Sequence, residues 1–468
     1  MTTSTEVRVT PARNKEISSV LVLISFMLVI SSFQLNATML SPAIGDMATR
    51  LNTNPGVIGW SSTVFLSVAA ALAVFFPPLA DKIGRKKVTT ISVAVMVVGT
   101  LIVLFTNSPA LLILGRALQG FCGATFALGN LTLRAILDPQ KYGFYIGLVA
   151  AVNSGVAGVD TLLGGVLTDA YGYKSVILVI LLVEVLALLM VQLYVPETSI
   201  PAVANMDWMG AISLTGALWG LNMAVTFGFS QVGWTSPLTI AMFAITLISA
   251  SAFFIVEKNH HDPLVPLSEL AARSTWAQLG TTFFTMASAF AVLIYLIPAV
   301  SQDPKSFGMA STTSAIMYLT PFSLAGWLVA PLVGSFAPRL GYRLVLRSGL
   351  IGTLVILGVM QFFGFGDKWL IFALALLMGV SYAGISNTCL NALGVLYASE
   401  TRPGVLPGLT SAAFNLGAGM GIGVMASTVA RSTDNGYAAG LLVGLICAAI
   451  AVAISMFLPA KVGSAEKI

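Results

Sequence analysis

The sequence predicts an all-α membrane protein, and its composition and patterning carry that prediction. Of its 468 residues, 57% are hydrophobic and 9% are charged, and the mean hydropathy is +0.92. A soluble globular chain has about 25% charged residues, so this chain has too few to cover a surface that faces water. The 44 glycines also fit helices that pack closely inside a bilayer. These numbers disfavour a soluble enzyme, a nucleic-acid-binding protein and a disordered chain.

Fourteen apolar runs are long enough to cross the bilayer, and each is assigned to a helix because a span must satisfy its own backbone hydrogen bonds. Short breaks that contain Pro, Gly, Asn or charged residues separate the runs. They lie near 18–44, 57–80, 88–106, 109–132, 143–167, 173–195, 208–230, 236–256, 276–299, 312–334, 343–364, 369–392, 406–430 and 436–458.

A weak internal repeat divides these spans into two groups of six. Gly84 and Arg85 follow the second span, and Gly341 and Arg343 follow the tenth. Repeated halves that meet around a site at the membrane midplane are typical of transporters. We therefore expect two six-helix bundles joined by two linking helices. The predicted boundaries are a tail at 1–17, a bundle at 18–196, linking helices at 208–256, a bundle at 276–458 and a tail at 459–468.

The distribution of positive charge predicts the orientation. With the N-terminus inside, seventeen Lys and Arg residues fall in inside segments or at their span edges, and five fall outside. Lys and Arg are retained on the cytosolic side, so both termini are expected there, in a multi-pass protein of the plasma membrane. The five outside residues are Arg50, Lys174, Lys305, Lys368 and Arg431.

No metal site, cofactor or catalytic centre is expected. The three cysteines lie inside apolar runs, and His260 and His261 have no further ligand at metal-binding spacing. The chain has no phosphate-binding Gly-rich motif with Lys and no recognisable set of nucleophile and base. A membrane enzyme is therefore the weaker alternative to a transporter.

Two motifs are informative together. The segment 81–87, Asp-Lys-Ile-Gly-Arg-Lys-Lys, follows the second span, and by itself is most simply a topology anchor that binds anionic lipid headgroups. The fourth span adds Arg116, Gln119, Gly120 and Gly123. The combination resembles the loop and fourth-span motifs of the major facilitator superfamily, in particular its fourteen-span drug:proton antiporter branch, over nearly the whole chain. This resemblance implies a conformational role for Asp81, Gly84, Arg85, Gln119 and Gly120.

The chain departs from that branch at two places. Asn36 stands where the branch often has an acidic residue two positions before a Thr, here Thr38. The fifth-span motif Gly-Pro-x-x-Gly-Gly is replaced by the segment 160–165, Asp-Thr-Leu-Leu-Gly-Gly. The resemblance implies proton-coupled efflux of a small organic molecule by alternating access. The altered fifth-span motif leaves a metabolite symporter or uniporter as the alternative.

Three charged residues fall within the spans, where charge is costly and usually functional: Arg116, Asp160 and Glu184. Arg116 and Asp160 are expected at similar depth, and we predict that they pair across neighbouring spans. Asp160 then gains and loses the coupled proton, or else forms a permanent clamp with Arg116 that never titrates. Glu184 is a second candidate for proton coupling, a contact for a cationic substrate, or a residue that faces a water-filled crevice without a role.

The expected partners are a small-molecule substrate, protons and the lipid bilayer, with no nucleic acid. Amide and aromatic side chains within the spans are candidate substrate contacts, although most such residues serve helix packing. The candidates are Gln34, Asn36, Asn153, Tyr295, Asn387 and Asn415.

Overall fold

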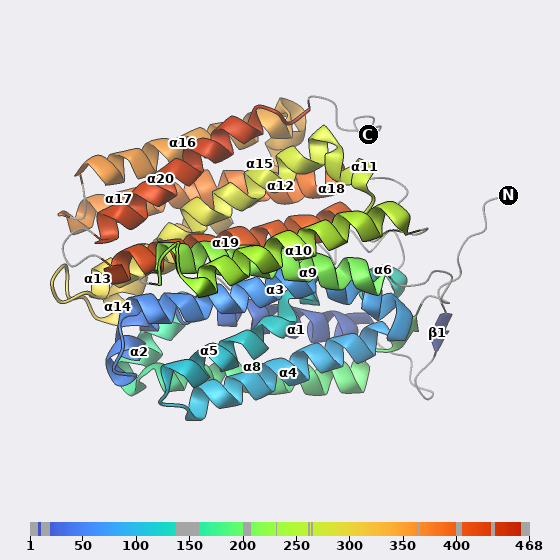
Figure 1. Cartoon of the computed structure of the whole chain (residues 1–468). Helices are drawn as coiled ribbons and strands as arrows, with labels where there is room; N and C mark the ends of the chain where they lie inside the picture. Colours follow the sequence, from blue (N-terminus) through green and yellow to red (C-terminus); the bar gives the residue numbers. More distant parts are fainter. Residues whose placement is uncertain are drawn as a thin grey trace.

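The computed structural model describes residues 8–10, 19–136, 159–199, 207–230, 232–260, 263, 265–363, 366–398, 405–431 and 436–459. The predicted all-α membrane fold is confirmed, because thirteen helices in these residues are long and apolar enough to cross a membrane (Figure 1). The remaining predicted span, 143–167, lies mostly outside the described residues. Its described part belongs to a helical segment at 159–171, so about fourteen spans remain consistent with the structure.

The first spans form the N-terminal half of the molecule. Several helices begin where the sequence supplies a cap: the Asn54 side chain, for example, accepts a hydrogen bond from the Val57 N–H at the start of the second span. The elements are α1 (Ser19–Thr38), η1 (Ser41–Ala43), α2 (Ile44–Arg50), α3 (Pro55–Ile83), α4 (Arg85–Phe105), α5 (Pro109–Gln119), η2 (Gly120–Ala124), α6 (Thr125–Ile136), the segment 159–171 and α8 (Tyr173–Tyr194).

The C-terminal half differs in that several of its spans contain π-helical stretches, which are frequent at functional sites. Its first span comprises α12 (Arg273–Thr285), the π-helical η3 (Met286–Phe290) and η4 (Val292–Leu296), and α13 (Ile297–Gln302). The others are α14 (Ser311–Ser314), η5 (Ala315–Leu319) and α15 (Thr320–Leu340); α16 (Tyr342–Phe363); α17 (Lys368–Met378), η6 (Gly379–Ser386) and α18 (Asn387–Leu396); α19 (Val405–Arg431); and α20 (Gly436–Ser455).

Two helices, α9 (Trp208–Phe229) and α10 (Pro237–Asn259), lie beside the junction of the halves, and a short α11 (Leu267–Ala271) follows. In Figure 1 they run between α3 below and α19 above, and α9 contacts both. A small antiparallel sheet joins β1 (Arg8–Thr10) to β2 (Glu197–Ser199), just before α9.

Small side chains allow α3 and α19 to pack closely along the junction. A Cβ added at Gly59 would lie 2.5 Å from the Cβ of Ala426 and 2.6 Å from a ring carbon of Tyr295. A Cβ at Gly56 would lie 2.6 Å from the Cβ of Ala430. Close approach through small residues is the usual way in which helices associate inside a membrane, where apolar burial gives no extra driving force.

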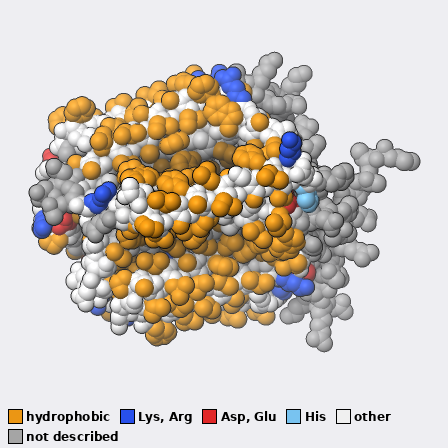
Figure 2. All heavy atoms as spheres, viewed as in Figure 1, with side chains coloured by type: hydrophobic (Ala, Val, Ile, Leu, Met, Phe, Trp, Pro, Cys, Tyr) orange, Lys and Arg blue, Asp and Glu red, His pale blue; other side chains and the backbone are white. Residues whose placement is uncertain are grey.

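The surface shown in Figure 2 is mostly hydrophobic, and its charged side chains gather toward the two ends of the bundle. Large apolar residues such as Leu182, Ile248 and Leu328 are more than 60% exposed, as expected for side chains that face lipid. One end of the bundle, on the right in Figure 1, carries Gly84, β1 and the C-terminal end of α20, and we call it the Gly84 end. The opposite end, on the left, carries α2 and α13, and we call it the Asp46 end.

Candidate functional site

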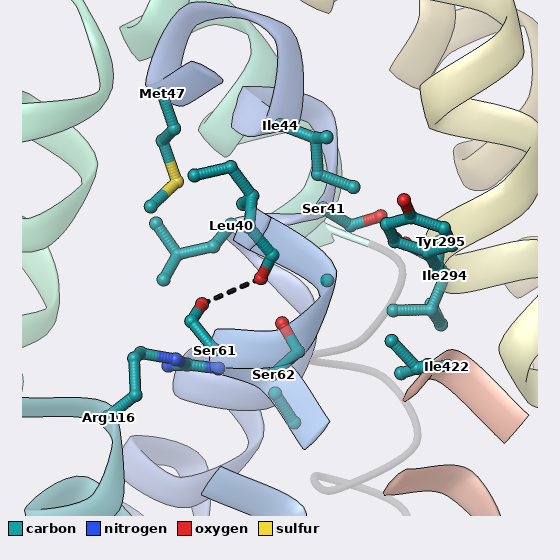
Figure 3. A pocket seen from close by; sticks show the side chains of 13 residues that line it. Leu40, Ser41, Ile44, Met47, Ser61, Ser62, Arg116, Ile294, Tyr295 and Ile422 are labelled. Carbon is teal, nitrogen blue, oxygen red and sulfur yellow. Dashed lines mark hydrogen bonds between the residues drawn. The ribbon is translucent and has the colours of Figure 1, made fainter. Parts of the chain in front are cut away.

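A pocket lies between the two halves, on the Asp46 side of the middle. The cavity volume in this conformation is about 20 Å³. Figure 3 shows the Arg116 side chain and the Tyr295 side chain on opposite sides of it. The polar side chains that line it belong to Ser41, Ser61, Ser62, Arg116 and Tyr295, and the rest are apolar or Gly. None of its described lining residues is Asp or Glu.

Tyr295 is the predicted substrate contact that the structure places in this pocket. The side chain comes from the π-helical η4 of the C-terminal half and is 2% exposed. Its hydroxyl has no hydrogen-bond partner among the described residues. A buried hydroxyl without a partner costs free energy, so a bound solute that accepts or donates a hydrogen bond there is favoured.

Glu184 lies in a buried polar network of the N-terminal half, close to the pocket. Its Oε1 accepts hydrogen bonds from Asn36 Nδ2 at 2.7 Å and from Thr100 Oγ1 at 2.9 Å. Its Oε2 has no partner within the described part of the chain. All three side chains are fully buried. Glu184 therefore projects from α8 into the interior of the protein, where it contacts α1 and α4.

Arg116 connects this network to the pocket. Its Nη1 donates to the backbone carbonyl of Asn36 at 3.0 Å and to Gln119 Oε1 at 2.9 Å. Gln119 Nε2 in turn donates to Thr100 Oγ1 at 2.8 Å, which closes the path to the Glu184 carboxylate. The guanidinium also lies over the Phe65 ring, 4.4 Å from its centroid, in a cation–π contact.

The predicted pair between Arg116 and Asp160 is wrong. Asp160 Oδ2 accepts a hydrogen bond from Thr38 Oγ1 at 2.5 Å, and Oδ1 has no partner among the described residues. Arg116 donates to Asn36 and Gln119 instead. Similar depth in the membrane does not bring two side chains together when they project from different faces of their helices.

Gly84, Arg85 and Gly120, three of the predicted motif residues, lie at turns or close helix contacts. Gly84 separates α3 from α4 with a φ of 111°, a conformation that suits Gly, and the Glu197 carboxylate lies where a Cβ would be. Arg85 is buried and donates through Nη1 to the Leu131 carbonyl at 2.6 Å. At Gly120 an added Cβ would lie 2.6 Å from the Phe65 carbonyl oxygen, so Gly permits close packing of η2 on α3.

The other predicted residues lie apart from the pocket lining or outside the described side chains. Gln34 donates to Thr38 Oγ1 at 3.3 Å, Asn387 accepts from Asn391 Nδ2 at 3.2 Å, and Asn415 is buried in α19. Asn153 lies outside the described residues, as does the side chain of Asp81.

The pocket serines and Thr100 were not among the residues predicted from the sequence. Ser and Thr are common in membrane helices, where they usually hydrogen-bond to their own backbone. Ser61 does so here, donating to the Ile58 carbonyl at 2.7 Å. The sequence therefore does not distinguish the pocket serines and Thr100 from residues that serve helix packing.

The halves are joined by hydrogen bonds at the Asp46 end. Asp169 accepts from the backbone N–H groups of Ser311 at 3.0 Å and Thr312 at 2.7 Å, across the junction. Nearby, Gly45 N–H donates to Gln302 Oε1 at 3.1 Å, and the Ser41 hydroxyl donates to the Ile294 carbonyl. The pocket is thus closed over by contacts between the halves at this end.

Comparison with known proteins gives a consistent result. The family model described as Major Facilitator Superfamily matches residues 26–422. The uridine/deoxyuridine transporter of Lactococcus lactis subsp. cremoris is 36% identical over 419 residues, which cover 87% of this chain and 86% of that protein. The multidrug resistance protein Stp of Mycobacterium tuberculosis is 26% identical over 403 residues, covering 85% and 73% of the two chains.

Solved structures support the fold. The human organic anion transporter MFSD10 superposes with a TM-score of 0.61 at 16% sequence identity, over 94% of this chain and 100% of that one. At this identity the likeness concerns the arrangement of the helices alone.

Proposed function

Because the chain belongs to the major facilitator superfamily, we propose that it moves a neutral, hydrogen-bonding solute across the membrane by exposing the pocket between its halves to each side in turn. Transport of a small molecule follows from membership of this family. The solute class, the coupling and the direction are the proposal.

The observation that carries the proposal is the chemistry of the pocket. Its described lining offers hydroxyl groups and the Arg116 guanidinium, and no carboxylate. A lipophilic cation would meet a like charge in a site of low dielectric, where repulsion is strong. A solute with carbonyl and hydroxyl oxygens can instead accept hydrogen bonds from Arg116 and exchange them with Tyr295.

Nucleosides are the first solute class to test. They are neutral, carry several carbonyl and hydroxyl groups, and have an aromatic base that can pack on a tyrosine ring. The uridine/deoxyuridine transporter that is 36% identical to this chain supports the same class. Efflux of a drug remains the second candidate, supported by the multidrug resistance relative at 26% identity.

Coupling to protons is the second part of the proposal. Two carboxyl groups, Asp160 and Glu184, are buried within the spans, and ionisable residues at this depth commonly serve ion or proton movement. We infer uptake together with protons, in the plasma membrane, with the Gly84 end on the cytosolic side because most Lys and Arg residues were assigned to that side.

Flux measurements in proteoliposomes test this proposal. Labelled uridine and the cationic dye ethidium are compared under an imposed pH gradient and without one. The expected result is accumulation of uridine on the side toward which protons flow, with no movement of ethidium. Ethidium movement opposite to the proton flow, with no uridine flux, would overturn the proposal in favour of drug antiport.

A further inference from the structure

We propose that Glu184, rather than Asp160, binds the coupled proton, and that it controls solute binding through its hydrogen-bonded connections to Arg116. This inference rests on the proposed function, since it assigns the residue that couples protons to the solute.

One oxygen of the Glu184 carboxylate, Oε2, offers a place for the proton. The Glu184 carboxylate is fully buried, and the hydrogen bonds that it accepts from Asn36 and Thr100 both reach Oε1. Oε2 has no partner among the described residues, so it offers a free site for a proton. Protonation there converts the carboxylate to the neutral acid and leaves both hydrogen bonds at Oε1 in place.

Hydrogen bonds connect Glu184 to the pocket through Arg116. Two routes join Glu184 to Arg116: one runs through Thr100 and Gln119, and the other through Asn36, whose amide donates to Glu184 while its backbone carbonyl accepts from Arg116. Both bonds of Arg116 use Nη1. Arg116 also lines the pocket (Figure 3), and the hydrogen bonds that it makes within the described chain leave Nε and Nη2 unused.

A proton on Glu184 changes the balance of charge around Arg116. With Glu184 ionised, the network holds one negative and one positive charge inside the protein. When Glu184 takes up a proton, Arg116 keeps its charge without a counter-charge in the network. An acceptor oxygen of the solute then becomes a better partner for Arg116, because an isolated buried cation is costly. Proton and solute therefore bind cooperatively, as solute–proton symport requires.

Few other titratable groups face Glu184. The Arg116 guanidinium and the Cys122 thiol do so from α5 and η2. On the helices packed against α8, α1 has no titratable side chain, and α4 has only the basic residues of its first turn, 85–87, at the Gly84 end. Glu184 is thus the acid of this cluster in the described structure.

Asp160 lacks such a connection. Its hydrogen-bonding side-chain partner is Thr38, which is bonded in turn to Gln34, and neither of these residues lines the pocket. A proton on Asp160 would change its hydrogen bond with Thr38, and no side-chain hydrogen bond leads from Thr38 or Gln34 to Arg116 or Glu184 in the described residues.

The test compares the wild type with Glu184→Gln and Asp160→Asn in uridine transport. Two assays are used: accumulation driven by a pH gradient, and exchange of labelled for unlabelled uridine with equal pH on both sides. Glu184→Gln is expected to lose the driven accumulation and to retain exchange. Asp160→Asn is expected to retain both. The proposal is overturned if Glu184→Gln shows driven accumulation at the wild-type level. It is also overturned if Asp160→Asn loses driven accumulation and Glu184→Gln does not.

A double variant that exchanges the two side chains keeps the proposal testable if Glu184→Gln alone does not fold. Asn36→Asp combined with Glu184→Gln moves the carboxyl to α1 and the amide to α8, across a contact of 2.7 Å. When this double variant folds, it is expected to recover accumulation driven by the pH gradient. If it folds and exchanges uridine but shows no driven accumulation, the proposal is contradicted. If the wild type moves no uridine in either assay, the proposed function itself fails, so the two failures are distinguishable.

Discussion

The two halves of the molecule use buried polar groups in different ways. The N-terminal half encloses three charges within its spans, Arg116, Asp160 and Glu184, each at most 3% exposed. In the described residues of the C-terminal half, from 273 to 459, no Asp, Glu, Lys or Arg is buried. Its buried polar side chains, such as Ser288, Tyr295 and Asn415, are neutral.

This difference indicates that the two halves contribute different kinds of group to the pocket. The N-terminal half supplies Arg116 and, behind it, the Glu184 network, whereas the C-terminal half supplies the free hydroxyl of Tyr295. A charge that must change during transport can be held in one half while the other half offers contacts that stay the same. Substitutions on each side of the pocket test whether the halves are separable in this way.

The largest effect is expected for Arg116→Ala. The change removes the positive charge that connects the pocket to Glu184 and leaves a buried carboxylate without its counter-charge, at a cost of about 3 kcal/mol or more. Uridine transport should fall by more than about a hundredfold, measured as initial uptake in proteoliposomes. The matched control is Arg50→Ala, which breaks an exposed pair with Asp46 and should have little effect. Equal losses in both variants would contradict the account.

A smaller effect is expected for Tyr295→Phe. The change removes only a hydroxyl that has no protein partner in the described chain, so stability should not fall. Uridine affinity should weaken by about 1 kcal/mol, or roughly fivefold, because one hydrogen bond to the solute is lost. The control is Tyr382→Phe. The Tyr382 hydroxyl lies 3.1 Å from Met286 Sδ, and Tyr382 does not line the pocket. Unchanged affinity in Tyr295→Phe would remove the tyrosine from the binding site.

The smallest effect is expected for Asp169→Asn, which weakens the hydrogen bonds from Ser311 and Thr312 across the junction. Loss of such a capping interaction costs about 0.5–2 kcal/mol. The Asp46 end should open more often, so a cysteine placed at Ser62 should react faster with a membrane-impermeant maleimide.

Asp46→Asn provides the matched control for this prediction. Asp46 accepts a hydrogen bond from the Tyr173 N–H at 2.7 Å, which is similar chemistry at a helix start but within one half. Its labelling rate at the same cysteine should equal that of the unsubstituted background. Faster labelling in both variants would show that the junction is not specifically involved.

Much of the fold was predictable from the sequence, because each span must contain its own run of apolar residues. The rotation of each helix about its axis was not predictable in the same way. Asn36 and Thr38 are two positions apart and so point about 200° apart on α1. Asn36 consequently contacts Glu184 and Thr38 contacts Asp160. Depth alone suggested the wrong partner for Arg116.

The pocket was predicted only in part. Tyr295 was singled out as an aromatic residue with a polar group inside a span, and the structure places it in the lining. Ser41, Ser61 and Ser62 carry no comparable signal, since a short hydroxyl side chain in a membrane helix usually bonds to its own backbone. Their position became informative only when both halves were assembled around them.

The most direct test of the account is the affinity of the purified protein for uridine at acidic and at alkaline pH, for the wild type and for Glu184→Gln. If a proton on Glu184 strengthens solute binding through Arg116, wild-type affinity should be higher at acidic pH, by about 5- to 150-fold for a typical coupling energy. The affinity of Glu184→Gln should be the same at both. A wild-type affinity that does not change with pH, or a variant that keeps the wild-type pH dependence, would contradict the claim that Glu184 couples the proton to the solute.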